Sequence, residues 1–213
     1  MANTYLPIGL SLKKRSCLVV GGGKVALRKV DTLLDYDSKI TVITPEPVEK
    51  IEYYASKGKL KLERRAYCSP EAETYGIVIS ASDDSTVNKT VYEDCRAAGV
   101  PINVVDNPAL CDVIFPAVIK RDCLSVAVST DGKAPFLSRH LRLILEGVFP
   151  ERWNRLAKLA SKFRIKVQKK WIGQPEEKAA AIERFLSADW QTILKEKSSD
   201  EIERKLEDFL NGT

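Results

Sequence analysis

Short apolar runs alternate with longer amphipathic stretches through the first half of the chain. Five of the runs have the length and β-branched content of strands: 16–20, 39–44, 60–67, 76–82 and 101–105. Between the first two, a helical period brings Ala26, Val30, Leu33 and Leu34 to one face. Strands that alternate with helices predict an α/β domain with a Rossmann-like parallel sheet, covered by helices on both faces.

Two further helices are marked by the residues at their ends. One is expected within 46–58, where Pro47 suits the first turn. The other is expected to begin at Asp84 or Ser85, both favourable N-caps, and to end at Gly99. These helices continue the alternation of strand and helix along the chain.

The pattern changes after about residue 112. Two strand-like runs within 112–135 are joined by a charged turn at Lys120–Asp122 with no helix between them, which favours an antiparallel pair outside the sheet. From Phe136 onward the period is helical. The apolar positions there form two stripes: Leu156, Leu159, Ala160, Phe163 and Val167, then Ile182, Phe185 and Leu186.

The composition is that of a globular protein with a mild basic excess. Of the 213 residues, 44% are hydrophobic and 30% are charged, and the net charge is +5. The stretch 152–171 carries eight Lys or Arg residues and no acid. It suits nucleic-acid phosphates, the carboxylates of an acidic small molecule, or a helix with a solvated face. Composition favours the solvated helix, so we expect no nucleic-acid partner.

The cysteines and the apolar runs indicate a cytoplasmic protein. Five cysteines are an odd number without CxxC spacing, so we expect reduced thiols and no metal site built from them. Residues 1–15 lack the apolar centre of a signal peptide, and no apolar run is long enough to cross a bilayer. We therefore expect no membrane partner.

The sequence SCLVVGGGKVALRK, at 16–29, contains a candidate nucleotide-binding turn between the first strand and the first helix. Gly21, Gly23 and Ala26 match the G-x-G-x-x-G/A dinucleotide fingerprint between a strand and a helix. Gly21 allows a tight turn, Gly23 lets the backbone approach a pyrophosphate, and Ala26 packs the helix on the sheet. The helix N-terminus then offers N–H groups to the phosphates.

The end of the second strand bears on the choice of dinucleotide. An acid is expected there to bind the adenosine ribose, but Thr44 occupies that place and Glu46 follows two residues later. Glu46 either reaches the ribose or favours the N-terminus of the next helix. No Arg or Lys lies within 43–47 to receive a 2′-phosphate, which favours NAD over NADP.

Four stretches in order resemble the precorrin-2 dehydrogenase family of siroheme biosynthesis. They are LPIGLSLKKRSCLVVGGGKVALRK, SASDDSTVN, INVVDNPALCDVIFPAVI and LSVAVSTDGKAPFLSRHLR. The family includes stand-alone enzymes and the N-terminal modules of multifunctional siroheme synthases. The resemblance extends over nearly the whole chain, and no methyltransferase-like sequence follows, which suggests the free-standing form.

The resemblance implies an activity and a division of the chain. Members transfer a hydride from precorrin-2 to NAD+, yielding sirohydrochlorin, and some also insert ferrous iron. The family fold implies an NAD-binding Rossmann domain at 1–112, a dimerisation region at 113–147 and a small helical domain at 148–213. Two chains form a homodimer, and the tetrapyrrole substrate lies in a cleft near both.

The resemblance also assigns site residues. Those placed against the cofactor are Gly21, Gly23, Lys24 and Val25 in the glycine turn, and Thr44, Pro45 and Glu46 after the second strand. The aspartate of the family's NVVD motif, a general acid/base, falls on Asp106. Independently, Asp106 follows an apolar strand at the edge where parallel sheets bind ligands, and a partly desolvated carboxylate there can accept a proton. Alternatively, Asp106, Asn107 and Pro108 merely start a turn.

Two functions of different class follow from these features. The first is NAD-dependent oxidation of precorrin-2, with Asp106 as the catalytic residue. The second is a sensor that binds NAD(H) and acts through the basic helical domain. Asp106 and the resemblance in the second half of the chain favour the enzyme.

Overall fold

A computed structural model describes residues 4–13, 15–196 and 198–212 of the chain. It divides the chain into two units, Met1–Phe115 and Pro116–Thr213. The division lies close to the expected boundary after residue 112. The further separation of a dimerisation region from a helical domain stays a prediction.

The first unit is built on the expected parallel sheet. Its strands are β1 (Ser16–Val20), β2 (Lys39–Ile43), β3 (Lys61–Glu63), β4 (Ile77–Ser80) and β5 (Ile102–Val104). They lie in the order β3-β2-β1-β4-β5, and each neighbouring pair is parallel. The central strands β1 and β4 are almost wholly apolar because both faces of the sheet are covered.

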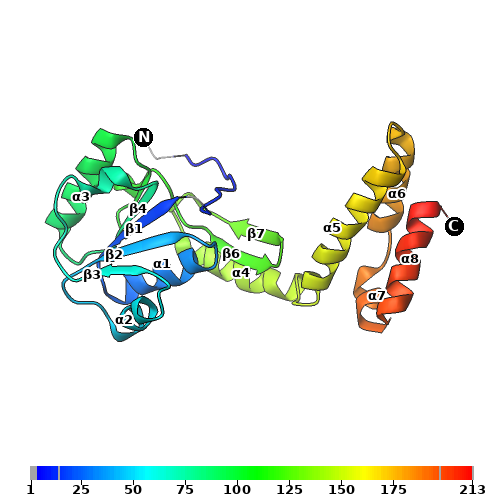
Figure 1. Cartoon of the computed structure of the whole chain (residues 1–213), viewed down its shortest axis with the longest axis horizontal. Coiled ribbons are helices and arrows are strands. Elements are labelled where there is room, and N and C mark those ends of the chain that lie inside the picture. Colours follow the sequence, from blue (N-terminus) through cyan, green and yellow to red (C-terminus); the bar gives the residue numbers. More distant parts are fainter. Residues whose placement is uncertain (1–3, 14, 197, 213) are drawn as a thin grey trace. The chain divides into compact units, whose positions relative to one another are not determined.

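Helices cover the two faces of this sheet (Figure 1). On one face α1 (Lys24–Leu34) and α2 (Glu49–Ser56) share a core with β1 and β2. On the other face α3 (Ser85–Ala98) packs on β4 and β5. The α1 side chains Ala26, Val30 and Leu33 are buried, which confirms the stripe expected from the helical period.

The helix ends agree with the sequence at α3 and differ at α2. The Asp84 carboxylate caps α3, accepting from the N–H groups of Thr86 and Val87 at 2.7 and 3.4 Å. The expectation that Pro47 lies in the first turn of α2 is wrong, because α2 begins at Glu49. Val48, the N-cap of α2, donates its N–H to the Gly22 carbonyl at 2.9 Å. This hydrogen bond connects the chain to the glycine turn just before the helix begins.

The remaining connections of the first unit are short. The run 60–67 forms only the three-residue strand β3, and two 3-10 turns follow at η1 (Glu71–Thr74) and η2 (Pro108–Leu110). Just after the strand, Arg65 forms ion pairs with Glu63 of β3 and with Glu71 of η1.

The second unit begins with the expected antiparallel pair. Strands β6 (Ala117–Arg121) and β7 (Leu124–Val128) pair in register, and α4 (Pro135–Val148) packs on both. The turn is tighter than the predicted Lys120–Asp122, since β6 continues through Arg121 and Asp122 takes a left-handed φ of 55°.

Four helices complete the second unit: α5 (Trp153–Lys170), α6 (Pro175–Leu186), α7 (Trp190–Glu196) and α8 (Ser199–Asn211). The α5 stripe is confirmed, with Leu159, Phe163 and Val167 buried. The α6 stripe is wrong in part, because Ile182 and Leu186 are 41% and 67% exposed. The buried face of α6 is set by Ala181 and Phe185, one turn apart, and the Phe185 ring stacks on Phe163 at 5.1 Å.

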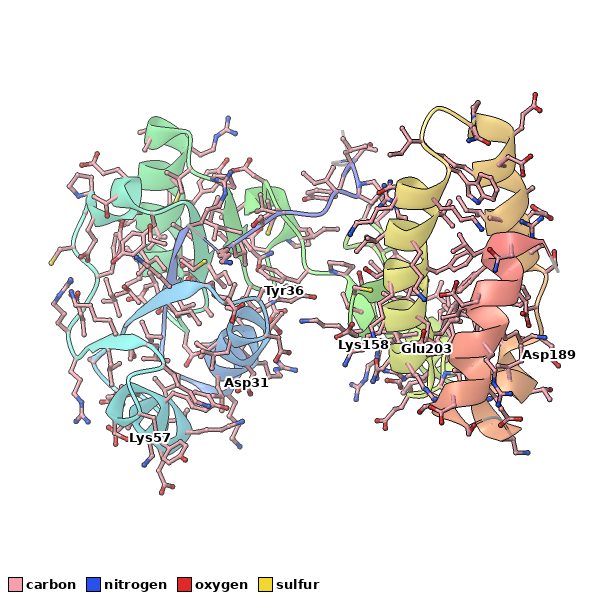
Figure 2. All side chains as sticks on the ribbon, turned by 45° about the vertical axis from the view of Figure 1, so that its right-hand side comes forward. Asp31, Tyr36, Lys57, Lys158, Asp189 and Glu203 are labelled. Carbon is pink, nitrogen blue, oxygen red and sulfur yellow. The ribbon has the colours of Figure 1, made fainter. Side chains whose placement is uncertain are left out.

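The basic face of α5 meets an acidic face of α8, and their side chains fill the space between these helices (Figure 2). Lys166 pairs with both Glu203 and Glu207 of α8. Part of the positive charge predicted to be solvated is therefore neutralised inside the unit. Among residues 4–13, 15–196 and 198–212, no helix is long and apolar enough to span a membrane.

Candidate functional site

The three consecutive glycines have different surroundings. Gly21 has a φ of 116°, and a Cβ there would lie 2.3 Å from the Ala81 carbonyl oxygen. A Cβ on Gly22 would lie 2.5 Å from Thr44 Oγ1. A Cβ on Gly23 would meet nothing within 4 Å. Packing inside the protein therefore explains the first two glycines, and only Gly23 leaves space for a ligand.

Backbone hydrogen bonds fix this turn to both neighbouring strands. The Gly21 N–H donates to the Ile43 carbonyl of β2 at 2.9 Å, and the Ala81 N–H after β4 donates to Val20 at 2.8 Å. A side-chain network holds the far side of the turn: Ser80 donates to Asn88 Oδ1 at 2.6 Å, and Asn88 Nδ2 donates to Ser82 at 2.8 Å. Contacts within the protein therefore hold the glycine turn in place.

The N-terminus of α1 fits a dinucleotide phosphate. Gly23 is the N-cap, and it has an extended backbone with no side-chain cap. The first turn carries no acid, so its N–H groups and the positive end of the helix dipole have no side-chain anion to bind. Lys24 is exposed and Val25 is half-buried beside Gly23. This combination of open space and uncapped N–H groups suits an anion.

The three residues that follow β2, Thr44 to Glu46, differ in burial. Thr44 is only 4% exposed, and its Oγ1 accepts from the Glu46 N–H at 3.3 Å. Pro45 and Glu46 are exposed. Thr44 thus shapes the turn against Gly22, and the Glu46 carboxylate is the group at this position that can reach a ribose.

The arginines after β3 are held by carboxylates. Arg64 pairs with Glu52 at 2.8 Å, and Arg65 pairs with Glu63 and with Glu71. The pKa of the Glu71 carboxyl is lowered, first by its hydrogen bond from Arg65. Since both guanidinium groups are engaged, neither is available to a 2′-phosphate without losing an ion pair.

Asp106 lies just beyond the carboxyl end of β5, with a left-handed φ of 59°. It is exposed, so the expectation of a partly desolvated carboxylate is wrong. The reason is that the chain turns outward here, as the Asn107 N–H bonds back to Val104 at 3.3 Å. The adjacent Val105 N–H donates to Ser80 at 2.9 Å and anchors the base of this turn to β4.

Two buried side chains hold the rest of the segment that carries Asp106. Asn103 Nδ2 donates to the Val113 carbonyl at 2.9 Å, and Cys111 Sγ donates to Val104 at 3.2 Å. Burial is the main cause of the raised pKa of the Cys111 thiol, so it stays protonated and serves as a donor. The Asp106 backbone is therefore well positioned although its carboxylate faces solvent.

Lys29 is a residue of this region that sequence reasoning missed. It is half-buried on α1, and its Nζ lies 4.3 Å from the centre of the Phe115 ring. Burial lowers the pKa of its ammonium group and the charge of Arg28 adds to this, whereas Cys111 and Asp106 act in the opposite direction. No local pattern reveals these contacts, because Phe115 and Asp106 lie far along the chain.

Parallel strands bring these groups to a single edge of the sheet. The glycine turn follows β1, Thr44 to Glu46 follow β2, and Asp106 follows β5, all at carboxyl ends. In open α/β sheets this edge binds ligands. Within the part of the chain that the structure describes, no cluster of three or more His, Cys, Asp or Glu side chains is arranged to hold a metal ion.

A parallel sheet whose first strand leads through a glycine turn into a helix defines the class of Rossmann-type dinucleotide-binding proteins. The chain belongs to the family described as putative NAD(P)-binding, whose sequence model matches residues 8–117.

Similar proteins extend the match beyond this domain. A siroheme synthase of Methylococcus capsulatus is 39% identical over 202 residues, which are 95% of this chain and 42% of the relative. One from Pseudomonas aeruginosa is 38% identical over 208 residues, 98% of this chain and 44% of the relative. The chain thus spans less than half the length of these relatives.

A solved structure shares the fold of the whole chain. The precorrin-2 dehydrogenase SirC superposes with a TM-score of 0.76 at 23% sequence identity, covering 97% of this chain and 100% of SirC.

Proposed function

We propose that this protein catalyses the NAD-dependent dehydrogenation of precorrin-2 to sirohydrochlorin. The observation that carries the proposal is the placement of Asp106 at the same sheet edge as the glycine turn, two strands away in the order β1-β4-β5. A carboxylate and an uncapped helix N-terminus on one side of the domain support a reaction between a dinucleotide and a second substrate. The similarity to siroheme synthases and to SirC supports the choice of substrate.

The residues divide the reaction between binding and proton transfer. Bound at the glycine turn, NAD+ would supply the acceptor for the hydride that leaves the reduced macrocycle. Gly23 and the first N–H groups of α1, at Lys24 and Val25, bind the pyrophosphate, and Glu46 binds the adenosine ribose. Loss of a hydride leaves the macrocycle with a positive charge, and the Asp106 carboxylate takes the proton whose departure restores neutrality. One hydride and one proton leave the substrate for each double bond formed.

The experiment that tests this function follows NADH absorbance with precorrin-2 as substrate. The proposal predicts NADH formation in proportion to sirohydrochlorin, with NAD+ preferred over NADP+ because no Arg or Lys lies within 43–47 and Arg64 and Arg65 are paired. Sirohydrochlorin formation without NADH, or no turnover at all, contradicts the proposal.

We also propose that two chains form a homodimer through α4. Six large apolar side chains of α4 are 38–78% exposed: Phe136, Leu137, Leu141, Leu143, Ile144 and Val148. So many on one helix exceed what a solvated surface ordinarily carries. A second copy presenting the same face covers both helices with an isologous contact.

The five reduced thiols are consistent with the cytoplasm as the proposed location.

A further inference from the structure

Lys29 lies on the side of α1 that faces the segment carrying Asp106. Its Nζ lies 4.3 Å from the Phe115 ring centre, and the charge of the Asp106 carboxylate favours its protonated form. Two residues further along, Asp31 points to the other side of the helix, where Tyr54 of α2 donates to it at 2.7 Å (Figure 2). Lys29 is thus directed towards β5 and away from α2.

Lys29 is also separate from the phosphate end of α1. It lies five residues after Lys24, which is about 7.5 Å along the helix axis. The uncapped N–H groups at Gly23 are therefore the nearer partners of a pyrophosphate. A ligand that contacts Lys29 and Asp106 occupies the β5 side of the site.

The Lys29 ammonium is incompletely compensated within the protein. Among the described residues no carboxylate lies within 4.0 Å of it, whereas Lys50 pairs with Asp31 at 3.1 Å and Arg96 pairs with Asp112 at 3.5 Å. Those two cations are more exposed and still have a partner. A half-buried cation without one bears a desolvation cost that an anionic ligand would offset.

We infer that Lys29 binds a carboxylate of the tetrapyrrole substrate, beside the Phe115 ring and next to Asp106. This inference rests on the proposed function and deepens it. The substrate class combines a flat apolar macrocycle with carboxylates around its rim. The Phe115 ring suits the apolar macrocycle, the Lys29 ammonium suits a rim carboxylate, and the Asp106 carboxylate supplies a proton acceptor on the same side of the site.

The test compares Lys29→Met with Lys29→Arg, and uses Lys39→Met as a matched control. Lys39 is an exposed lysine at the amino end of β2, away from the ligand edge. Binding of metal-free sirohydrochlorin is titrated by absorbance, NAD binding by calorimetry, and KM and kcat for precorrin-2 are measured separately. A charge-assisted contact predicts about 10–100-fold weaker tetrapyrrole binding and a higher KM for Lys29→Met.

The other measurements make the inference falsifiable. NAD affinity and melting temperature are expected to stay unchanged in Lys29→Met, and Lys29→Arg is expected to retain most of the tetrapyrrole affinity. Unchanged sirohydrochlorin affinity in Lys29→Met overturns the inference, as does a loss confined to NAD, which would assign the cation to the cofactor. A fall in melting temperature together with both affinities shows a structural role instead. Absence of turnover in the unmodified enzyme contradicts the proposed function, while the binding titration still tests Lys29.

Discussion

At the scale of single residues, the glycine turn shows how one short sequence serves both folding and binding. Gly21 and Gly22 face backbone and side-chain atoms of neighbouring strands, and Gly23 faces open space. The fingerprint was sufficient to predict the tight turn at Gly21, whereas the approach of a pyrophosphate at Gly23 stays a prediction. It did not reveal that Gly22 packs against Thr44, because that contact needs the end of β2 in place.

These different surroundings predict opposite outcomes for two neighbouring substitutions. Gly21→Ala introduces a Cβ 2.3 Å from the Ala81 oxygen at a φ of 116°. We expect it to lower the free energy of unfolding in urea by at least about 1–3 kcal/mol. Gly23→Asp is expected to keep the stability and to abolish NAD binding by calorimetry, since its carboxylate would occupy the pyrophosphate position. A stable Gly21→Ala, or a Gly23→Asp with normal NAD affinity, would refute this assignment of roles.

At the scale of helices and strands, the apolar period was sufficient to predict where most elements of the first unit lie in the sequence. It predicted the five strands of the sheet, although β3 is shorter than expected, and the inward face of α1. The residue types at 84 and 85 predicted the start of α3, with Asp84 or Ser85 as its cap, and the structure has Asp84. The apolar period failed where a distant element decides the outcome. On α6 the apolar Ile182 and Leu186 are exposed. The side chains of α6 that pack in the core shared with α5 and α8 are instead those of Ala181 and Phe185.

The same limit applies to the candidate site. The turn after β1 and the acid after β5 could be predicted, because strand ends in a parallel sheet share an edge. The exposure of Asp106 and the position of Lys29 could not, since both depend on how the segment 107–115 folds back on α1. When the surroundings of a residue depend on a segment far along the chain, the residues next to it in sequence do not indicate them.

The Asp84 cap of α3 gives a prediction at this scale. Asp84→Ala removes an acceptor for two N–H groups, at 2.7 and 3.4 Å, and should destabilise the protein by about 1 kcal/mol in urea unfolding. Asp83→Ala is the matched control, because Asp83 is an exposed neighbour outside the cap, and should change stability by less than about 0.5 kcal/mol. Equal effects of the two variants would mean that the loss is one of charge and not of capping.

At the scale of the whole molecule, the two units have different tasks in the proposed function. The first unit contains the nucleotide site and Asp106, and the second contributes an exposed apolar helix and a separate helical core. The helical core is closed by aromatic contacts such as Phe185 with Trp190 at 4.5 Å. The basic character of α5 is partly balanced by α8, which leaves less free positive charge than the composition of 152–171 suggests.

The exposed face of α4 predicts the oligomeric state. Ile144 is 55% exposed at the middle of this face, so Ile144→Glu places a charge inside the proposed contact. Sedimentation at micromolar concentration should show a dimer for the unmodified protein and a monomer for Ile144→Glu. The control is Ile165→Glu on α5, where the side chain is 51% exposed, and it should remain dimeric. An unmodified protein that sediments as a monomer would contradict the proposed contact.

The most direct test of the central claim is the rate of dehydrogenation by Asp106→Asn. Asparagine keeps the shape of the side chain and suits the left-handed backbone at a φ of 59°, but it cannot accept the proton. We therefore predict unchanged folding and NAD affinity, with NADH formation from precorrin-2 reduced by about 10²–10⁴-fold. If Asp106 only starts a turn, asparagine would serve as well. Near-normal turnover by Asp106→Asn would contradict the account and show that the proton acceptor lies elsewhere.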